Sequence, residues 1–233
     1  MADTWLTFWQ EKNAFDDLMN VNYAYFLKKV EQYVQPSAGD VVLDIGSGPG
    51  HLEDAWHHRV KEIHGVDISV RYNEMVREKH KRHPNVVVHD LPADNYLDLG
   101  MLQGKQFNII VVMSVLQYYR SKEEIIVLLK NIKKLAAPGS ELLLCDLMVQ
   151  SSFLKEIFQI LKDAVKEGKL ISILSLFVKL RFSKYYTIKK QAGFLVLSNE
   201  EWMDIIQQLN LDAQFIKEPI TLQKSRKSIR VQY

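Results

Sequence analysis

A glycine-rich segment is the feature of this sequence that points most directly to chemistry. It reads Leu43-Asp44-Ile45-Gly46-Ser47-Gly48-Pro49-Gly50, and it follows an apolar run that begins at Val41. Its three glycines allow a tight turn and let the backbone approach a bound ligand closely. We therefore expect a loop that leaves the end of a strand, contacts a small molecule and leads into a helix at His51.

Two acidic residues further along the chain fit the same ligand. Asp67 ends the second apolar run, and Asp90 follows the third. A carboxylate at the end of the second parallel strand can accept hydrogen bonds from both ribose hydroxyls of an adenosine. Asp90 could accept a hydrogen bond from the adenine amino group. The sequence thus predicts an adenosine lying across the carboxyl ends of the first three strands.

The spacing of the glycines disfavours a dinucleotide. The third glycine comes one residue earlier than a dinucleotide site requires, and His51 stands where a small residue would allow close helix–strand contact. Pro49 also removes an amide that a pyrophosphate could use. An NAD-binding oxidoreductase is therefore a less favoured alternative. A second alternative is that the glycines only form a tight turn and bind no ligand.

Regular alternation of short apolar runs and amphipathic segments supplies the framework for this loop. We expect strands at 41–45, 62–66, 86–88, 107–112 and 141–145, with helices between them that include 70–81 and 122–135. Strands separated by helix-length segments predict right-handed βαβ units and a parallel sheet. The expected fold class is α/β, a three-layer sandwich with helices on both faces of the sheet.

Two flanks and an insertion complete the expected single domain of residues 1–233. After residue 197 the pattern returns, with a helix at 199–209, whose N-cap is Ser198, and strands at 213–216 and 228–233. Residues 1–35 predict one or two helices and carry many aromatic side chains: Trp5, Phe8, Trp9, Phe15, Tyr23, Tyr25 and Phe26. Residues 148–197 break the alternation and predict an inserted helical cap. Its basic part, 169–190, holds six Lys or Arg and no Asp or Glu.

Composition and charge exclude several classes of protein. The chain has 233 residues, 47% of them hydrophobic and 25% charged, and a net charge of +2. These values disfavour disorder and a dedicated nucleic-acid binder. One cysteine, Cys145, permits no internal disulfide and suits a reducing compartment. We see no secretory signal and no apolar stretch near the ~18 residues of a membrane span, so we expect a cytoplasmic protein.

With these motifs, the sequence resembles the class I S-adenosylmethionine-dependent methyltransferases over residues 23–147 and the last three C-terminal elements. The resemblance implies seven strands, the last of them antiparallel. It also implies that the glycine loop surrounds the methionine moiety and that Asp67 holds the ribose. Tyr72 replaces a methionine found in many relatives and could stack on the adenine. The implied cofactor-binding residues are Asp44, Gly46, Ser47, Gly48, Gly50, Asp67, Ile68, Tyr72, Asp90, Leu91, Met113, Ser114 and Val115.

The segment after the fourth strand narrows the resemblance to the branch that acts on small molecules such as quinones, sugars and natural products. It reads Met113-Ser114-Val115-Leu116-Gln117-Tyr118-Tyr119. The segment lacks the Asn-Pro-Pro-Tyr motif of DNA amino-methyltransferases and the glutamate pair of protein-arginine methyltransferases. Some small-molecule enzymes have Val-Leu-His-His here, and because Gln117 and Tyr118 replace the histidines, no histidine base can be carried over.

Four residues are candidates for catalysis because they are expected at strand ends or in the loop: Asp146, Tyr118, Tyr119 and His51. Asp146, just after the fifth strand, could accept a proton from the acceptor, or it could simply be a solvent-facing or capping residue. For each of the two tyrosines, packing is favoured over catalysis. We expect no metal site, because His57 and His58 should point in different directions and His80 and His83 flank a surface turn.

These observations predict transfer of a methyl group from S-adenosylmethionine to a small organic acceptor, with oxygen favoured over nitrogen and carbon. The alternative is a methyltransferase-like subunit that binds the cofactor without chemistry of its own. We expect residues 1–35 and the cap to form a lid over the acceptor, which would be apolar, acidic or both. Segment 169–190 could instead be purely structural or touch a membrane surface. We expect no nucleic-acid partner, and the oligomeric state stays open.

Overall fold

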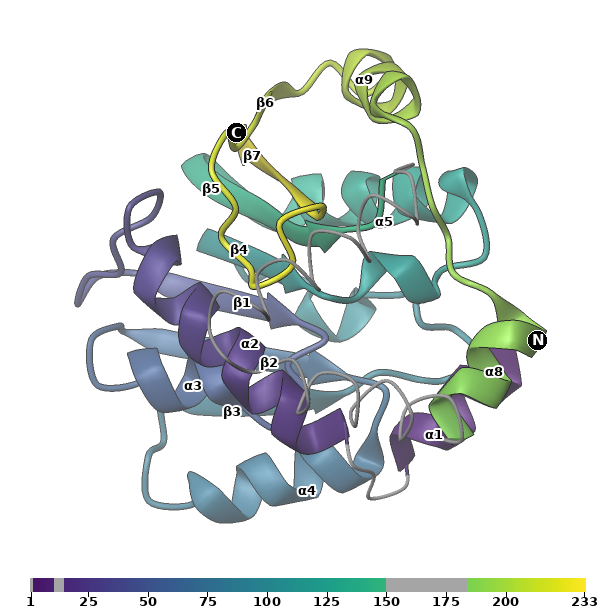
Figure 1. Ribbon diagram of the computed structural model, residues 1–233. Coiled ribbons are helices and arrows are strands. Elements are labelled where there is room, and N and C mark those ends of the chain that lie inside the picture. Colours follow the sequence, from purple (N-terminus) through teal and green to yellow (C-terminus); the bar gives the residue numbers. More distant parts are fainter. Residues whose placement is uncertain (1, 11–14, 150–183) are drawn as a thin grey trace, which may run out of the picture.

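The computed structural model describes residues 2–10, 15–149 and 184–233. Within them, a seven-stranded sheet with the order β3-β2-β1-β4-β5-β7-β6 has helices on both faces, as Figure 1 shows. The strands are β1 Val41–Ile45, β2 Glu62–Asp67, β3 Val86–Asp90, β4 Phe107–Met113, β5 Ala136–Leu147, β6 Asp212–Phe215 and β7 Lys227–Gln232. The helices are α1 Ala2–Gln10, α2 Phe15–Val30, α3 His51–Trp56, α4 Val70–Lys79, α5 Lys122–Leu135, α8 Lys184–Ala192 and α9 Asn199–Gln208.

The pairing of the strands confirms the predicted fold class. Strands β1 to β5 pair in parallel, whereas β7 runs antiparallel to both β5 and β6. This seven-stranded sheet, with its last strand antiparallel, is the arrangement that the family resemblance implies. Residues 150–183, the larger part of the inserted cap expected over 148–197, lie outside the described residues.

The largest difference from the expected elements is the start of β5. The strand begins at Ala136, directly after α5, rather than at residue 141. Pro138 and Gly139 are typical of turns, so the sequence around them shows no apolar run that would predict a strand. Ala136 nevertheless pairs with Phe107 of β4, and the register shifts before Ile109 pairs with Glu141.

Two apolar cores hold the helices against the sheet. On one face, Leu43 and Ile110 belong to a buried cluster that includes Ile125 of α5 and Trp202 of α9. On the other face, Val42 and Val111 pack in a cluster with residues of α2 and α3, among them Phe26 and Trp56. Alternate residues of β1 and β4 thus face opposite cores, which explains their near-continuous apolar sequence.

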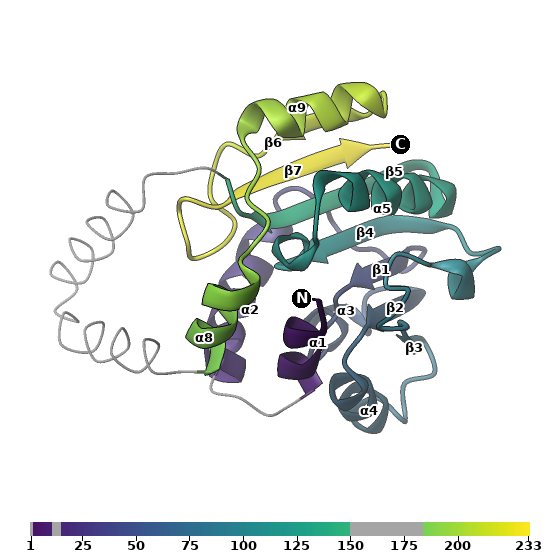
Figure 2. The same cartoon turned by 90° about the vertical axis from the view of Figure 1, so that its right-hand side faces the viewer.

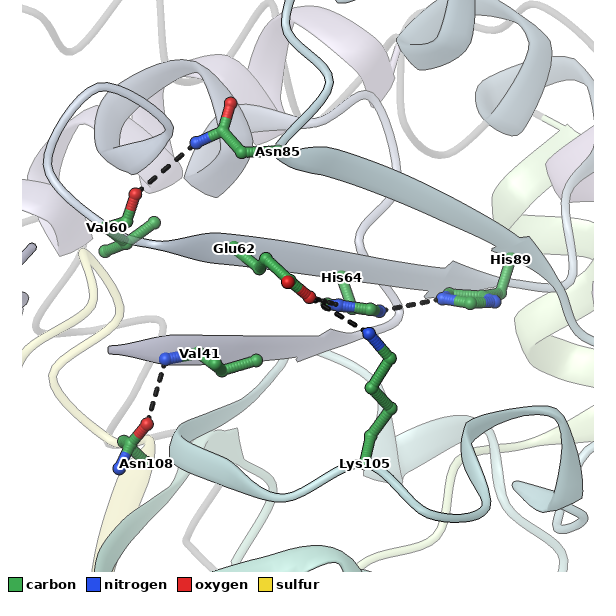
Figure 3. A network of polar contacts seen from close by, with 8 residues as sticks. All are labelled: Val41, Val60, Glu62, His64, Asn85, His89, Lys105 and Asn108. Atoms are coloured by element: carbon green, nitrogen blue, oxygen red, sulfur yellow. Dashed lines mark hydrogen bonds and ion pairs between the residues drawn. The ribbon is translucent and has the colours of Figure 1, made fainter. Parts of the chain in front are cut away.

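A polar network links β2, β3 and the segment before β4 (Figure 3). His64 of β2 is 1% exposed, and its Nδ1 lies 3.0 Å from Nε2 of His89 in β3. Its Nε2 lies 3.0 Å from Glu62 Oε2, to which Lys105 also donates a hydrogen bond. Burial lowers the pKa of His64 and, with the neighbouring His64 ring, lowers the pKa of His89 to about 4. Both rings are therefore neutral at pH 7.

Candidate active site

A cavity of about 370 Å³ lies at the carboxyl ends of β1, β2, β4 and β5. Its wall combines the glycine loop, the ends of these strands, helices α1 and α2, and the segment between β6 and β7. The lining residues are Trp5, Trp9, Met19, Asn22, Tyr23, Ile45, Gly46, Gly48, Pro49, Val66, Asp67, Ile68, Tyr72, Leu91, Tyr96, Met113, Ser114, Val115, Gln117, Tyr118, Tyr119, Asp146, Leu222, Gln223 and Arg226.

The glycine loop forms an open cradle at the floor of this cavity. Gly46 has a φ of 75°, and a Cβ added there would lie 2.1 Å from the side chain of Val115. Gly48 has a φ of 51°, and an added Cβ would meet nothing within 4 Å. Gly46 is thus required by packing, whereas Gly48 presents bare backbone to the cavity. A ligand can approach the main chain closely at this point.

Asp67 is held in place at the end of β2 by the backbone around it. Its Oδ2 accepts a hydrogen bond from the Gly48 amide at 2.9 Å, and its Oδ1 accepts one from the Ser69 amide at 2.7 Å. Burial raises the pKa of the carboxyl. Because each carboxylate oxygen can accept a second hydrogen bond, Asp67 remains able to bind ligand hydroxyls.

Asp44 lies beneath the loop and does not line the cavity. It is fully buried, and neither carboxylate oxygen has a hydrogen-bond partner among the described residues. Burial, reinforced by the charge of Asp67, raises the pKa of Asp44 to about 8. A buried carboxylate without a partner is costly. A cationic ligand in the cradle would relieve that cost, so the residues present fit a ligand with an ammonium or sulfonium charge.

The ends of β4 and β5 join in a second polar cluster. Ser114 directly follows β4, whereas Asp146 lies within β5, one residue before its end and not after the strand as expected. Both adopt left-handed backbone, with φ of 58° and 63°. Ser114 Oγ donates a hydrogen bond to Asp146 Oδ2 at 2.6 Å, and Arg226 Nε lies 3.8 Å from Asp146 Oδ1. Non-glycine residues in this conformation are strained, and such strain gathers at functional sites.

Opposing effects act on the Asp146 carboxyl. Burial raises its pKa, while Arg226 and the Ser114 hydroxyl partly offset that rise. A raised pKa moves a carboxylate toward the range in which it can accept and release a proton near neutral pH. Asp146 therefore has the position and the environment of a candidate base.

Aromatic side chains close the cavity on the side of α1. Trp5 stacks on Phe194 with ring centroids 5.1 Å apart, and Tyr118 contacts both Trp5 and Trp9. Ile188 of α8 is buried in the same cluster. Figure 2 shows α1 between α8 and α4, and α1 packs against both helices. Trp5 Nε1 also donates a hydrogen bond to the Gly193 carbonyl at 3.2 Å.

Most of the residues predicted from the sequence meet in this one cavity: Gly46, Gly48, Asp67, Ile68, Tyr72, Leu91, Met113, Ser114, Val115, Tyr118, Tyr119 and Asp146. Five do not line it: Asp44, Ser47, Gly50, His51 and Asp90. Ser47 is buried. At Gly50, an added Cβ would lie 2.7 Å from Val76. The ring centroids of His51 and Tyr23 are 4.7 Å apart. Contact of these five residues with a cofactor or substrate stays a prediction.

Asp90 is positioned differently from the expectation, because it is the last residue of β3 and does not follow the strand. Its carboxylate accepts hydrogen bonds from Arg77 at 2.7 Å and from Asn73 at 2.8 Å. These bonds engage both oxygens outside the cavity. The adjacent Leu91 is the residue of this segment that lines it.

Several lining residues have no counterpart among the predicted site residues. Trp5, Trp9 and Tyr23 come from the aromatic N-terminal flank, which the sequence predicts as a lid without naming contacts. Leu222 and Arg226 come from the segment between β6 and β7, which has no periodic pattern and no motif. The structure also brings His57, His80 and His83 together, whereas the sequence suggests no such cluster.

In the described part of the chain, no helix combines the length and apolar character needed to cross a membrane. A family model described as a methyltransferase domain matches residues 19–198. No curated protein sequence matches the chain.

Solved structures share the fold at low sequence identity. The YcgJ protein of Bacillus subtilis is 19% identical with a TM-score of 0.58, over 83% of this chain and 71% of that one. The N-methyltransferase NodS of Bradyrhizobium japonicum WM9, solved with S-adenosylhomocysteine, is 15% identical with a TM-score of 0.53, over 95% and 88%. A phosphoethanolamine N-methyltransferase of Haemonchus contortus is 17% identical with a TM-score of 0.54, and 64% of this chain covers 33% of that protein.

The family match covers more than half of the sequence, and the sheet order, the glycine loop and the acid at the end of β2 agree with it. This match favours a methyltransferase over the alternative of an NAD-binding oxidoreductase. This chain belongs to the class I S-adenosylmethionine-dependent methyltransferases.

Proposed function

We propose that this chain transfers the methyl group of S-adenosylmethionine to a small organic acceptor, and that the acceptor atom is oxygen in preference to nitrogen or carbon. One observation carries the proposal. A single cavity joins the Gly48–Asp67 cradle to the cluster of Ser114, Asp146 and Arg226. Cofactor and acceptor can therefore occupy neighbouring parts of the same space, as a direct transfer between them requires.

The cradle side of the cavity supplies the cofactor contacts. Asp67 would accept hydrogen bonds from the ribose hydroxyls, and the loop at Gly46 and Gly48 would pack on the methionine moiety. Tyr72 and Leu91 line the cavity where the adenine is expected. When bound, S-adenosylmethionine supplies an electrophilic methyl group on a positively charged sulfur. The unpartnered carboxylate of Asp44 supports this choice, because it favours a cationic ligand nearby.

Asp146 is the residue best placed to take part in the chemistry. An acceptor hydroxyl beside it would donate its proton to the carboxylate, which makes the oxygen a better nucleophile. Ser114 and Arg226 hold the carboxylate in position for this task. In this proposal, Tyr118 shapes the aromatic wall that it forms with Trp5 and Trp9. His51 and Tyr119 remain secondary candidates.

The acceptor chamber favours a molecule with an apolar body and an oxygen-bearing or acidic group. The wall on the α1 side is aromatic, and Arg226 is the one cationic side chain among the described lining residues. Its Nη1 is buried without a hydrogen-bond partner in the described part of the chain. A carboxylate, phosphate or carbonyl of the acceptor would satisfy this donor.

We propose that the chain forms a single domain. In it, the N-terminal helices and the cap, residues 148–197, act as a lid over the acceptor. Support comes from α8, which contains the described residues of segment 169–190. It buries Ile188 against Trp5 and Phe8, while Lys189 and Lys190 stay exposed. This apolar face is already used within the chain, which favours a lid over a membrane contact.

Turnover with a panel of acceptors tests the proposal. The protein is incubated with S-adenosylmethionine and phenols, hydroxy acids or amines, and formation of S-adenosylhomocysteine is measured. We expect an aromatic acceptor with an acidic group to react, and Asp146→Asn to lower kcat by about 10²–10⁴-fold, the usual contribution of a general base.

Binding measurements accompany this assay. If Asp146→Asn binds S-adenosylhomocysteine as the wild type does, its lost turnover reflects chemistry and not an empty cofactor site. A wild-type chain that binds the cofactor and methylates none of the acceptors would instead be the subunit without chemistry. Unchanged kcat in Asp146→Asn would remove Asp146 from the proposed mechanism.

A further inference from the structure

Three histidines meet near the amino ends of β2 and β3, whereas the cavity lies at the carboxyl ends of the strands. His57 follows the last residue of α3, His80 caps the end of α4, and His83 lies in the turn before β3. Each offers one ring nitrogen, and these nitrogens lie within 4.8 Å of one another. Both helices end near the amino ends of β2 and β3, away from the glycine loop.

A hydrogen bond to one ring nitrogen fixes the orientation of two of these rings. His57 Nδ1 lies 2.9 Å from the carbonyl oxygen of Glu53. Because a carbonyl can only accept, Nδ1 carries the proton and Nε2 keeps its lone pair. His80 Nε2 lies 2.9 Å from Asp54 Oδ1, so Nε2 donates to the carboxylate and the lone pair is on Nδ1. A histidine that binds a metal typically donates its second nitrogen to a carbonyl or carboxylate in this way.

The ring of His80 supplies an independent sign of a ligand. His80 is 5% exposed, and its Nδ1 is buried without a hydrogen-bond partner among the described residues. A buried ring nitrogen with an unused lone pair is a cost that a bound metal ion would remove. The ring centroid of His80 lies 5.0 Å from that of His57 and 5.5 Å from that of His83, so this ring belongs to the three-histidine cluster.

Neighbouring contacts hold the ends of both helices together around the cluster. Asn85 Nδ2 donates to the carbonyl of His57 at 2.6 Å and to that of Val60 at 3.4 Å, and Figure 3 shows the second of these bonds. The amide of His83 donates to the His80 carbonyl at 2.8 Å. Lys79 pairs with Asp54, the carboxylate that orients His80. The site is therefore built on a supported backbone.

We propose that His57, His80 and His83 bind a late first-row divalent metal ion, Zn²⁺ in the first place, at a site separate from the methyl-transfer cavity. Imidazole nitrogens favour such ions over Mg²⁺ or Ca²⁺. Zinc–nitrogen bonds of about 2.0–2.1 Å require the three nitrogens to move closer together, and the exposed His83 side chain can make that movement. Water would complete the tetrahedron. The ion would tie the end of α3 to the turn between α4 and β3, which is a structural role.

Metal titration of the full chain, free of any histidine tag and stripped by a chelator, tests this site. Zn²⁺ is titrated in competition with a chromophoric chelator, and Co²⁺ is added separately to read the coordination from its visible spectrum. We expect one ion per chain, a tetrahedral Co²⁺ spectrum and a higher Tm with Zn²⁺. His83→Ala and His57→Ala should each weaken Zn²⁺ binding at least tenfold and remove the rise in Tm.

The chain provides a matched control next to the site. His58 is exposed, adjoins His57 and stands outside the cluster, so His58→Ala should bind Zn²⁺ like the wild type. Asp54→Asn tests the positioning role of this carboxylate and should weaken binding by about 10–100-fold at unchanged stoichiometry. Absence of stoichiometric binding would overturn the proposal. So would Zn²⁺ affinity that survives His83→Ala, or that falls as far in His58→Ala. None of these outcomes depends on methyl transfer.

Discussion

At the scale of the residue, Asp67 is expected to bind the ligand and also holds the glycine loop in place, and the sequence alone does not reveal the second role. A carboxylate facing a cleft suggests a group that serves the ligand alone, so that its removal would leave the apo protein unharmed. The structure corrects this view, because both oxygens of Asp67 accept backbone hydrogen bonds, from Gly48 and from Ser69. Asp67 therefore shapes the glycine loop that it is predicted to serve.

Asp67→Ala is accordingly expected to have two effects. Affinity for S-adenosylhomocysteine should fall by about 1.5–3 kcal/mol, the range for hydrogen bonds to a charged group. The free energy of unfolding should also fall, by about 1–3 kcal/mol, because the buried Ser69 amide and the half-buried Gly48 amide lose their acceptor. Calorimetry and chemical denaturation measure the two quantities. Asp98→Ala is the matched control, since Asp98 accepts the Gly100 amide at 2.8 Å but lies outside the cavity. Unchanged ligand affinity in Asp67→Ala would place the ribose elsewhere.

At the scale of the element, the two neutral histidines that join β2 to β3 predict a dependence on pH. The pKa of His89 is lowered to about 4, whereas an unfolded histidine titrates near 6.5. The unfolded chain therefore binds more protons between these values. The stability contributed by the pair is present above pH 6.5 and is lost as the pH falls toward 4.

The pair is isolated by comparing the wild type with His89→Gln in chemical denaturation at several pH values. Buried acids such as Asp44 and Glu53 have raised pKa values and act in the opposite direction, so the difference between the two proteins is the informative quantity. We expect that difference to shrink as the pH falls from 6.5 to 4. A constant difference would show that the His64–His89 contact does not titrate as described.

The elements also show what can and cannot be predicted from this sequence. Helix α5 agrees with its prediction, because a clear amphipathic pattern lies between Ser121 and β5. Asp67, Ser114 and Asp146 meet because parallel strands end at a common edge, which a strand pattern already implies. Arg226 could not be predicted, since its loop reaches the cavity only through the antiparallel pairing of β7. The cluster of His57 with His80 depends on where two helices end, and spacing along the chain does not encode that.

At the scale of the whole molecule, α1 and α8 are the parts proposed to move with ligand. Ile188 of α8 packs with Trp5 of α1, and Trp5 also stacks on Phe194 and donates a hydrogen bond to Gly193, just after α8. We expect the amides of both helices to exchange more slowly when S-adenosylhomocysteine and an acceptor bind, whereas the remote α9 should not respond. Hydrogen exchange followed by mass spectrometry measures this. Protection confined to the loop at Gly46 would show that both flanks are merely structural.

Binding of S-adenosylhomocysteine to the intact chain tests the central claim most directly, because every proposed role in the cavity depends on it. Titration calorimetry should show one site per chain, with no response to NAD. At 100 times its dissociation constant, the ligand should stabilise the fold by about 2.7 kcal/mol and raise Tm accordingly. Saturable binding of NAD, with S-adenosylhomocysteine giving neither heat nor a change in Tm, would contradict the account.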